Sequence, residues 1–290
     1  MEIMINRTLS TIDDIHQLLN KTMEVVDQLN SRAAVTLNMK RLRYITPIGF
    51  TGLLSVLDYL EDHFEVGIVA PFNISPIKYM ERMNFFKVCS KNVKEQFEEQ
   101  KDMTTLYNRH RNSLEDKLLE IRVATTHPQI VEISTLIKRI FKNKGLKGNR
   151  ISDIQSFITE LGNNVIDHTN SSCFIAVKNN EDENEIEIAV ADRGEGIYNS
   201  LKDVLSENSP HDIVKAAITT KASRLSEEDR GKGLMDIKQR AFRWSEASVA
   251  LRTNNSVYEI TKDEVNPTLE GKTSFGTFFS IKVNYSIDRL

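Results

Sequence analysis

Hydrophobic and polar residues alternate along the first 90 positions in patterns that switch between helix-like and strand-like. Apolar side chains recur every three or four residues between Ser10 and Leu29, which predicts an amphipathic helix. Ser10 or Thr11 can cap it by accepting hydrogen bonds from first-turn amides. The patterns further predict strands at Ala33–Met39 and Val66–Ala70 and helices at Phe50–His63 and Ile77–Asn84, with a break at Thr46–Gly49. This alternation predicts a small α/β domain.

The stretch from about Lys91 to Glu120 has a different character. Acidic and basic residues are mixed there, apolar residues are sparse, and proline and glycine are absent. The composition predicts a charged helical connector, which we place at residues 91–117. Two interpretations stay open, a helix exposed to solvent and a helix that dimerises or signals.

The second half of the chain, residues 118–290, predicts a larger unit of helices and strands. Amphipathic patterns predict helices at Gln129–Lys144, Ser152–His168 and Leu234–Trp244. Strands are expected at Leu118–Ala124, Cys173–Lys178, Glu185–Ala191, Ala247–Arg252, Val257–Thr261 and Thr277–Val283. The segment Tyr198–Arg230 has weak periodicity and many polar residues, so we expect it to be long and mobile.

Composition narrows the classes of protein that fit this pattern. A chain of 290 residues is long enough for two domains, and 40% apolar with 27% charged residues is typical of globular proteins. A formal charge of −3 provides no basic excess for binding nucleic acid. Two distant cysteines, Cys89 and Cys173, make neither a disulfide framework nor a zinc site. With no leader-like or membrane-spanning apolar stretch, we expect a cytoplasmic protein without membrane contact.

Candidate chemistry lies in four short segments, of which the first two carry the carboxylates. Glu160 and Asn164 are four residues apart in a predicted helix and so share one face. A carboxylate there can orient or deprotonate an attacking hydroxyl or water, and an amide oxygen is a ligand suited to Mg²⁺. Asp192 follows a predicted strand, where it can accept a hydrogen bond from an adenine amino group. Gly194 and Gly196 let the backbone approach a ligand closely.

Two later segments complete the pattern. Gly231-Lys232-Gly233-Leu234 opens a predicted helix, whose free amides favour phosphate. Thr277, within Phe275–Phe278, is placed to support a base pocket. Each segment alone is more often a turn or a connector, but the ordered combination is specific. By contrast, Gly271-Lys272-Thr273 does not complete a phosphate-binding loop, because Asn266 stands where that loop needs glycine.

On these segments, residues from about 118 to 290 resemble the histidine-kinase-like ATPase domain of the GHKL superfamily, in the form found in anti-sigma-factor serine kinases. The resemblance implies a Bergerat fold, with a mixed sheet and helices on one face. It implies ATP and Mg²⁺ as cofactors, Asn164 as the metal ligand and Glu160 as the catalytic base. Asp192 would bind the adenine amino group.

The same resemblance implies roles for the remaining nucleotide-binding positions. Gly194 and Gly196 would shape the adenine pocket, and residues 198–230 would form an ATP lid. Gly231 and Gly233 would lie at the phosphates. One or more of the bases Lys221, Arg224, Arg230 and Lys232 would meet phosphate charge. The other implied cofactor-binding positions are His168, Ile197, Leu234 and Thr277.

Residues 1–90 are similar to a STAS-like domain, on the segment Val35–Phe50. In the anti-sigma antagonists of that family, a strand leads to Asp-Ser-Ser-Gly and a helix, and the second serine accepts phosphate. Here Thr46, Pro47 and Ile48 precede the glycine, so the residue at the acceptor position has no hydroxyl. Thr46 and Thr51 are hydroxyls nearby, and we expect both to be structural.

Together the two resemblances predict a regulatory or signalling protein whose nucleotide state controls protein–protein contacts. Its activity stays open between an ATPase and a serine/threonine protein kinase. The alternatives are a nucleotide sensor without turnover and, less favoured, a histidine kinase, since His110 lacks the acidic, proline-containing surroundings of an acceptor histidine. We expect a STAS-type or other regulatory protein as partner, allow a homodimer, and expect no nucleic acid.

Overall fold

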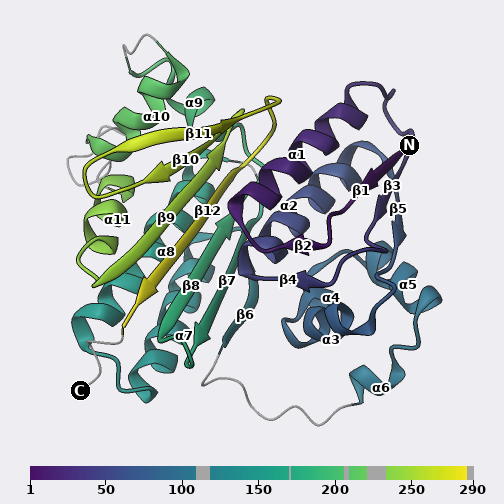
Figure 1. Cartoon of the computed structure of the whole chain (residues 1–290), viewed down its shortest axis with the longest axis horizontal. Coiled ribbons are helices and arrows are strands. Elements are labelled where there is room, and N and C mark those ends of the chain that lie inside the picture. Colours follow the sequence, from purple (N-terminus) through teal and green to yellow (C-terminus); the bar gives the residue numbers. More distant parts are fainter. Residues whose placement is uncertain (109–117, 170, 206–208, 221–232, 286–290) are drawn as a thin grey trace.

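The computed structural model describes residues 1–108, 118–169, 171–205, 209–220 and 233–285. Figure 1 shows two units of helices and strands packed side by side. A three-stranded and a two-stranded sheet belong to the N-terminal unit, and a seven-stranded sheet belongs to the C-terminal unit. The chain therefore has the mixed α and β architecture that its patterning predicts.

The N-terminal unit is built on a small parallel sheet, in the order β1 (Glu2–Met4), β3 (Ala34–Asn38) and β5 (Glu65–Val69). A second parallel pair joins β2 (Thr8–Leu9) to β4 (Tyr44–Ile45). Strands β1, β2 and β4 were not predicted, because strands of two or three residues are too short to show a two-residue repeat.

Helix α1 (Ile12–Val26) begins as its sequence predicts, at a capped threonine. The Thr11 hydroxyl accepts a hydrogen bond from the Asp14 amide at 3.1 Å, and the Asp14 carboxylate accepts one from the Thr11 amide at 3.2 Å. This reciprocal capping box satisfies two amides that the helix itself leaves free.

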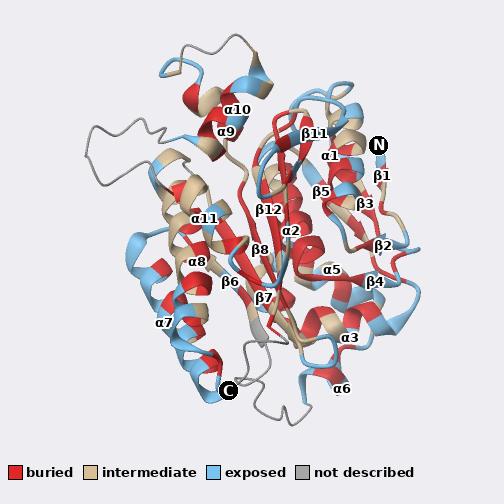
Figure 2. Cartoon of the chain, turned by 60° about the vertical axis from the view of Figure 1, so that its left-hand side comes forward, coloured by how far each residue is buried: buried red, intermediate tan, exposed pale blue. Residues whose placement is uncertain are grey.

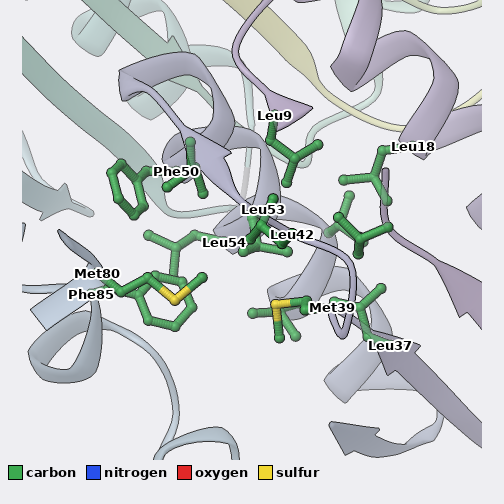
Figure 3. Packing of buried hydrophobic residues seen from close by; sticks show 14 of the residues in the cluster. Leu9, Leu18, Leu37, Met39, Leu42, Phe50, Leu53, Leu54, Met80 and Phe85 are labelled. Atoms are coloured by element: carbon green, nitrogen blue, oxygen red, sulfur yellow. The ribbon is translucent and has the colours of Figure 1, made fainter. Parts of the chain in front are cut away.

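Helix α2 (Pro47–His63) runs through the centre of the molecule. It begins inside the segment Thr46–Gly49, where we expected a break, and that expectation was wrong for residues 47–49. Proline fits the first turn because its missing amide hydrogen has no helical partner to lose. In Figure 3, Phe50, Leu53 and Leu54 of α2 pack among apolar residues of the N-terminal strands, loops and helices. Helices α3 (Ile74–Arg82) and α4 (Phe85–Val88) follow.

The start of the expected connector is helical but is built into the N-terminal unit. Helix α5 (Lys91–Gln100) buries Val93 and Phe97 completely. The side-chain amides of Gln96 and Gln100 each bond to backbone groups on the free edge of β5, at 2.6 to 3.0 Å. The helix thereby covers a strand edge, a role that its charged composition did not indicate. Helix α6 (Thr104–Tyr107) follows, and residues 109–117 are outside the described part.

The C-terminal sheet has seven strands. Their order is β11 (Val265–Glu270), β10 (Ser256–Ile260), β9 (Glu246–Thr253), β12 (Thr277–Asn284), β8 (Glu185–Ala191), β7 (Cys173–Asn180) and β6 (Leu118–Ala124). Every neighbouring pair is antiparallel, so the mixed sheet implied by the resemblance was wrong. Short turns join β7 to β8 and β9 to β10, and such turns connect antiparallel strands.

Helices α7 (His127–Asn143), α8 (Gly148–His168) and α11 (Gly233–Ala241) lie on one side of this sheet (Figure 1). Each buries an apolar stripe in a core that also contains side chains of β7, β8, β9 and β12. These are the three helices that the amphipathic patterns predict, and α11 ends three residues before the predicted Trp244.

Two further helices lie where we expected a long mobile segment. Helix α9 (Gly196–Leu201) and helix α10 (Pro210–Thr219) make residues 198–201 and 210–219 regular, so that expectation was wrong for them. Residues 206–208 and 221–230 of the expected segment lie outside the described part. The Ser209 hydroxyl caps α10 by accepting from the Asp212 amide at 3.2 Å. Four apolar residues of α10 are buried in the core: Ile213, Val214, Ala217 and Ile218. The polar residues around them hid this apolar face in the sequence.

The N-terminal unit covers the opposite side of the seven-stranded sheet, and Figure 2 shows buried residues of α2, β8 and β12 in this central layer. One apolar cluster joins α1 and α2 to sheet residues that include Phe174, Ala189, Ala191 and Phe278. The small alanine side chains leave room for α2 to approach the strands closely. The resemblance implied helices on one face, whereas this sheet carries helices on both.

Candidate functional site

Helix α8 provides the first wall of a pocket of about 300 Å³. Glu160 and Asn164 line this pocket one helical turn apart, as their spacing predicts. Leu161 and Val165, on the adjoining face, are buried in the core. The apolar face therefore anchors the helix while the polar face points into the pocket.

Asp192 lies just beyond the end of β8, at the base of the pocket, and only 3% of it is exposed. The Gly194 amide donates to Asp192 Oδ1 at 2.6 Å. Burial raises the pKa of this carboxyl to about 7, although hydrogen bonds from Gly194 and Thr277 oppose the rise. Thr277, at the start of β12, lines the same pocket. A ligand that entered at this point would meet both Asp192 and Thr277.

Gly196 and Ile197 form a second part of the wall, at the start of α9. Gly196 has a φ of +80°, a conformation that favours glycine. The Ile197 amide donates to the Thr253 hydroxyl at 2.9 Å, and the Tyr198 amide donates to Asn254 Oδ1 at 3.1 Å. These bonds tie α9 to the turn between β9 and β10 and hold Ile197 at the pocket.

Gly233, the first residue of α11, brings a third segment to Glu160 and Asn164. A Cβ atom at this position would lie 2.7 Å from Glu160 Oε2 and 3.6 Å from Asn164 Nδ2. A larger residue at this position would therefore have to displace the Glu160 carboxylate. Leu234 also lines the pocket.

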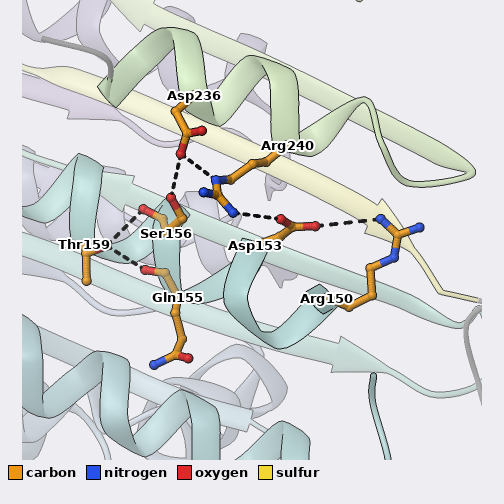
Figure 4. Close-up of polar contacts among 7 residues, drawn as sticks. All are labelled: Arg150, Asp153, Gln155, Ser156, Thr159, Asp236 and Arg240. Atoms are coloured by element: carbon orange, nitrogen blue, oxygen red, sulfur yellow. Dashed lines mark hydrogen bonds and ion pairs between the residues drawn. The ribbon is translucent and has the colours of Figure 1, made fainter. Parts of the chain in front are cut away.

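A polar network holds α11 in place against α8 (Figure 4). Arg240 pairs with Asp236 at 2.5 Å and with Asp153 of α8 at 3.2 Å. Ser156 donates to Asp236 at 2.9 Å, so both helices contribute to the network. Burial raises the pKa of Glu160, the Asp236 carboxylate adds to the rise, and Arg240 opposes it. A carboxyl with a raised pKa is a better proton acceptor, which is the property a general base needs.

A group in the pocket wall, centred on His127 at the start of α7, was not predicted from the sequence. His127 Nδ1 lies 3.0 Å from Asn163 Oδ1, and Nε2 lies 3.1 Å from Asp167 Oδ1. All three residues line the pocket. Asn163 and Asp167 are four apart on α8, a spacing that could have been noticed, but no pattern in the sequence connects them to His127.

The predicted site residues fall into three groups. Most of them line the pocket: Glu160, Asn164, His168, Asp192, Gly196, Ile197, Gly233, Leu234 and Thr277. Gly194 supports Asp192 through its amide. The remaining positions lie outside the described residues, and so does His110 of the histidine-kinase alternative: Lys221, Arg224, Arg230, Gly231 and Lys232.

The segment that carries the resemblance to STAS-like domains is buried. Ile48 and Thr51 have no exposed surface and Thr46 is almost fully buried. The Thr46 hydroxyl donates to the Ser10 carbonyl at 3.3 Å, and the Thr51 hydroxyl donates to the Ile48 carbonyl at 3.3 Å. Both hydroxyls therefore have the structural role that we expected.

Two further features are absent from the described residues. No group of three or more histidine, cysteine, aspartate or glutamate side chains in them is arranged to hold a metal ion. Within the same residues, no helix combines the length and apolar character needed to cross a membrane.

Comparison with known proteins adds little to this geometry. No known family matches the chain, and no curated protein is detectably similar to it. Among solved structures, the chain is similar to a chain in "The crystal structure of SiaB-SiaC complex from Pseudomonas aeruginosa", with 14% identity and a TM-score of 0.34. The match covers 67% of this chain and 99% of that chain. A similarity this low defines neither fold nor activity.

Proposed function

We propose that this chain binds ATP with Mg²⁺ in the pocket between α8, α9, α11 and the ends of β8 and β12, and uses it in regulation. The strongest support is that segments far apart in the sequence meet at one pocket. Residues from four distant segments, represented by Glu160, Asp192, Gly233 and Thr277, line one pocket. The resemblance to GHKL ATPases, which rests on sequence alone, assigns the same four segments to one nucleotide.

The shape and chemistry of the pocket suit the parts of a nucleotide. Asp192 offers a buried acceptor for an adenine amino group, beside apolar Ile197 and Val190. A buried carboxylate that accepts a hydrogen bond discriminates strongly between bases, because the wrong base leaves it unpaired. The amide start of α11, at Gly233, suits phosphate.

Magnesium fits the polar face of α8. Asn164 lines the pocket one helical turn from Glu160 and offers a hard oxygen ligand. Mg²⁺ commonly takes one or two protein ligands together with substrate phosphates, so the lack of a three-residue acidic cluster among described residues is compatible with it. When bound, the ion would neutralise phosphate charge, and Glu160 would orient or deprotonate the attacking hydroxyl or water.

The test follows the γ-phosphate of labelled ATP in the presence of Mg²⁺. The full chain is incubated alone and with a cell extract, beside Asn164→Ala and the matched control Asn149→Ala. Asn149 is exposed near the start of the same helix and does not line the pocket. Label released as phosphate indicates an ATPase, and label on a protein indicates a kinase and identifies its substrate. Binding without transfer indicates a sensor. Loss in Asn164→Ala with retention in Asn149→Ala supports the assignment, whereas no ATP binding by the wild type rejects it.

We further propose that the nucleotide state changes protein–protein contacts of the chain, as the resemblance to anti-sigma-factor kinases suggests. Limited proteolysis with and without Mg·ATP tests this directly. An unchanged cleavage pattern with bound nucleotide would contradict a conformational response.

A further inference from the structure

Helix α2 of the N-terminal unit contacts residues 192–194, called here the Asp192 segment, from outside the pocket. Ser55, Asp58 and Asp62 share one face of α2, since they are three or four residues apart. The Ser55 hydroxyl donates to the backbone carbonyl of Asp192 at 2.7 Å, and both residues are buried. This bond joins residues 137 positions apart in sequence.

A second contact fixes the next residue of the segment. Arg193 Nε lies 2.6 Å from Asp58 Oδ2, and Arg193 Nη2 lies 2.5 Å from Asp62 Oδ2. One guanidinium thus spans two carboxylates from consecutive turns of α2. A planar guanidinium held at two points has a defined orientation, which a single flexible ion pair does not impose.

A third contact reaches the same segment through the loop just before β12. Tyr59 of α2 stacks on Phe275, with ring centroids 4.0 Å apart and planes 15° apart. Next to Phe275, the Gly276 amide donates to the Gly194 carbonyl at 2.6 Å. A Cβ atom on Gly276 would lie 2.3 Å from the Asp192 carbonyl oxygen, so this approach needs glycine. Helix α2 therefore supports the segment directly and through its neighbour.

We propose that Ser55, Asp58 and Asp62 are positioning residues for base recognition. They hold the backbone at Asp192 and Arg193, and the backbone in turn holds the Asp192 carboxylate at the pocket. None of the three lines the pocket, so each acts through another residue. The inference rests on the proposed function and extends it, because it makes the N-terminal unit part of the nucleotide site.

The experiment measures dissociation constants of the full chain for ATP, GTP and inorganic tripolyphosphate by calorimetry. The variants are Ser55→Ala and the double change Asp58→Asn with Asp62→Asn. Glu61→Gln is the matched control, since Glu61 lies on the same helix but accepts from Ser90 within the N-terminal unit at 2.5 Å. Thermal unfolding of each variant verifies that measurements are made on folded protein.

We expect both α2 variants to bind ATP about three- to tenfold more weakly, the range for loss of one positioning polar contact, which is a hydrogen bond for Ser55 and ion pairs for Asp58 and Asp62. The preference for ATP over GTP should fall by a similar factor, while tripolyphosphate binding and the Glu61→Gln control stay unchanged. A purely structural role would lower thermal stability without moving the ratio of ATP to GTP affinity.

Three results would overturn the inference. Wild-type ATP affinity and base preference in both variants would remove α2 from recognition and leave the proposed function intact. An equal loss in Glu61→Gln would show a general charge effect. Failure of the wild type to bind ATP would reject the proposed function and this role together. If Ser55→Ala does not fold, the double variant decides, because Asp62 is half exposed.

Discussion

The pH dependence of ATP affinity follows from the environment of Asp192. Burial raises the pKa of this carboxyl to about 7 from its ordinary value of 3.8. An ionised carboxylate accepts a stronger hydrogen bond from an amino group than a neutral carboxyl does. ATP should therefore bind the ionised form preferentially, and its affinity should fall as pH falls through 7.

The magnitude follows from the ionised fraction. With a pKa of about 7, Asp192 is roughly 90% ionised at pH 8 and roughly 10% at pH 6. If only the ionised form binds well, the dissociation constant rises about tenfold over this interval, or about 1.4 kcal/mol. The effect of pH on the stability of the fold has the opposite sign to its effect on ATP affinity. Since the folded protein holds this proton more tightly than the unfolded chain, Asp192 lowers the free energy of unfolding as pH rises from about 4 to about 7.

The assay is calorimetric titration with Mg·ATP from pH 6 to pH 8, at saturating Mg²⁺, on the wild type and Asp192→Asn. The carboxamide keeps the shape of the side chain and does not titrate. It should bind more weakly than the wild type at pH 8, and the two curves should converge near pH 6. The rest of the pocket lining is the same in both proteins, so the difference between the two curves isolates Asp192. A flat wild-type profile, or the same slope in Asp192→Asn, would refute the reasoning.

Three further predictions test other parts of the structure. Glu160→Gln should keep ATP affinity within about threefold but lose most γ-phosphate transfer or release, since a general base contributes roughly 10²–10⁴-fold; unchanged turnover would exclude that role. Arg240→Ala removes the contacts to Asp236 and Asp153 and should lower the free energy of unfolding in urea by about 1–3 kcal/mol. Because Arg240 opposes the rise in the Glu160 pKa, the same variant should shift the pH profile of turnover to higher pH. A chain that begins at Leu118 exposes the apolar sheet face that includes Phe174, Val257 and Phe278, and should self-associate in size-exclusion chromatography; a stable monomer would contradict the shared core.

Much of the C-terminal unit could be predicted because its helices and strands are long enough to show their periods. The strands Leu118–Ala124 and Glu185–Ala191 have the predicted bounds. The pocket residues on α8 followed from a spacing of four, which is a local property of any helix. Glycines at 194, 196 and 233 could be found because close approach and unusual backbone angles need glycine wherever they occur.

What could not be predicted depends on distant contacts. His127 reaches the pocket only because α7 packs beside α8, and nothing near His127 in sequence indicates this. In the sequence, Ser55, Asp58 and Asp62 are ordinary polar residues of an apolar helix. Their role is visible only in the structure, where they contact Asp192 and Arg193 after β8. The charged composition of α5 likewise concealed its role, since two glutamine side chains take the place of a neighbouring strand.

Two of the polar contacts between the units lie beside the strands that carry the pocket residues Asp192 and Thr277. Helix α2 holds Asp192 and Arg193 after β8. Helix α1 holds the loop before β12, where Lys272 Nζ pairs with Asp27 at 2.6 Å and the Lys272 amide donates to Asn20 at 2.9 Å. The segment Gly271-Lys272-Thr273, which fails as a phosphate-binding loop, thus serves the interface instead. Because Asp192 and Thr277 lie close to these two contacts, we expect a change in how the N-terminal unit sits to reach these two pocket residues before it reaches Glu160.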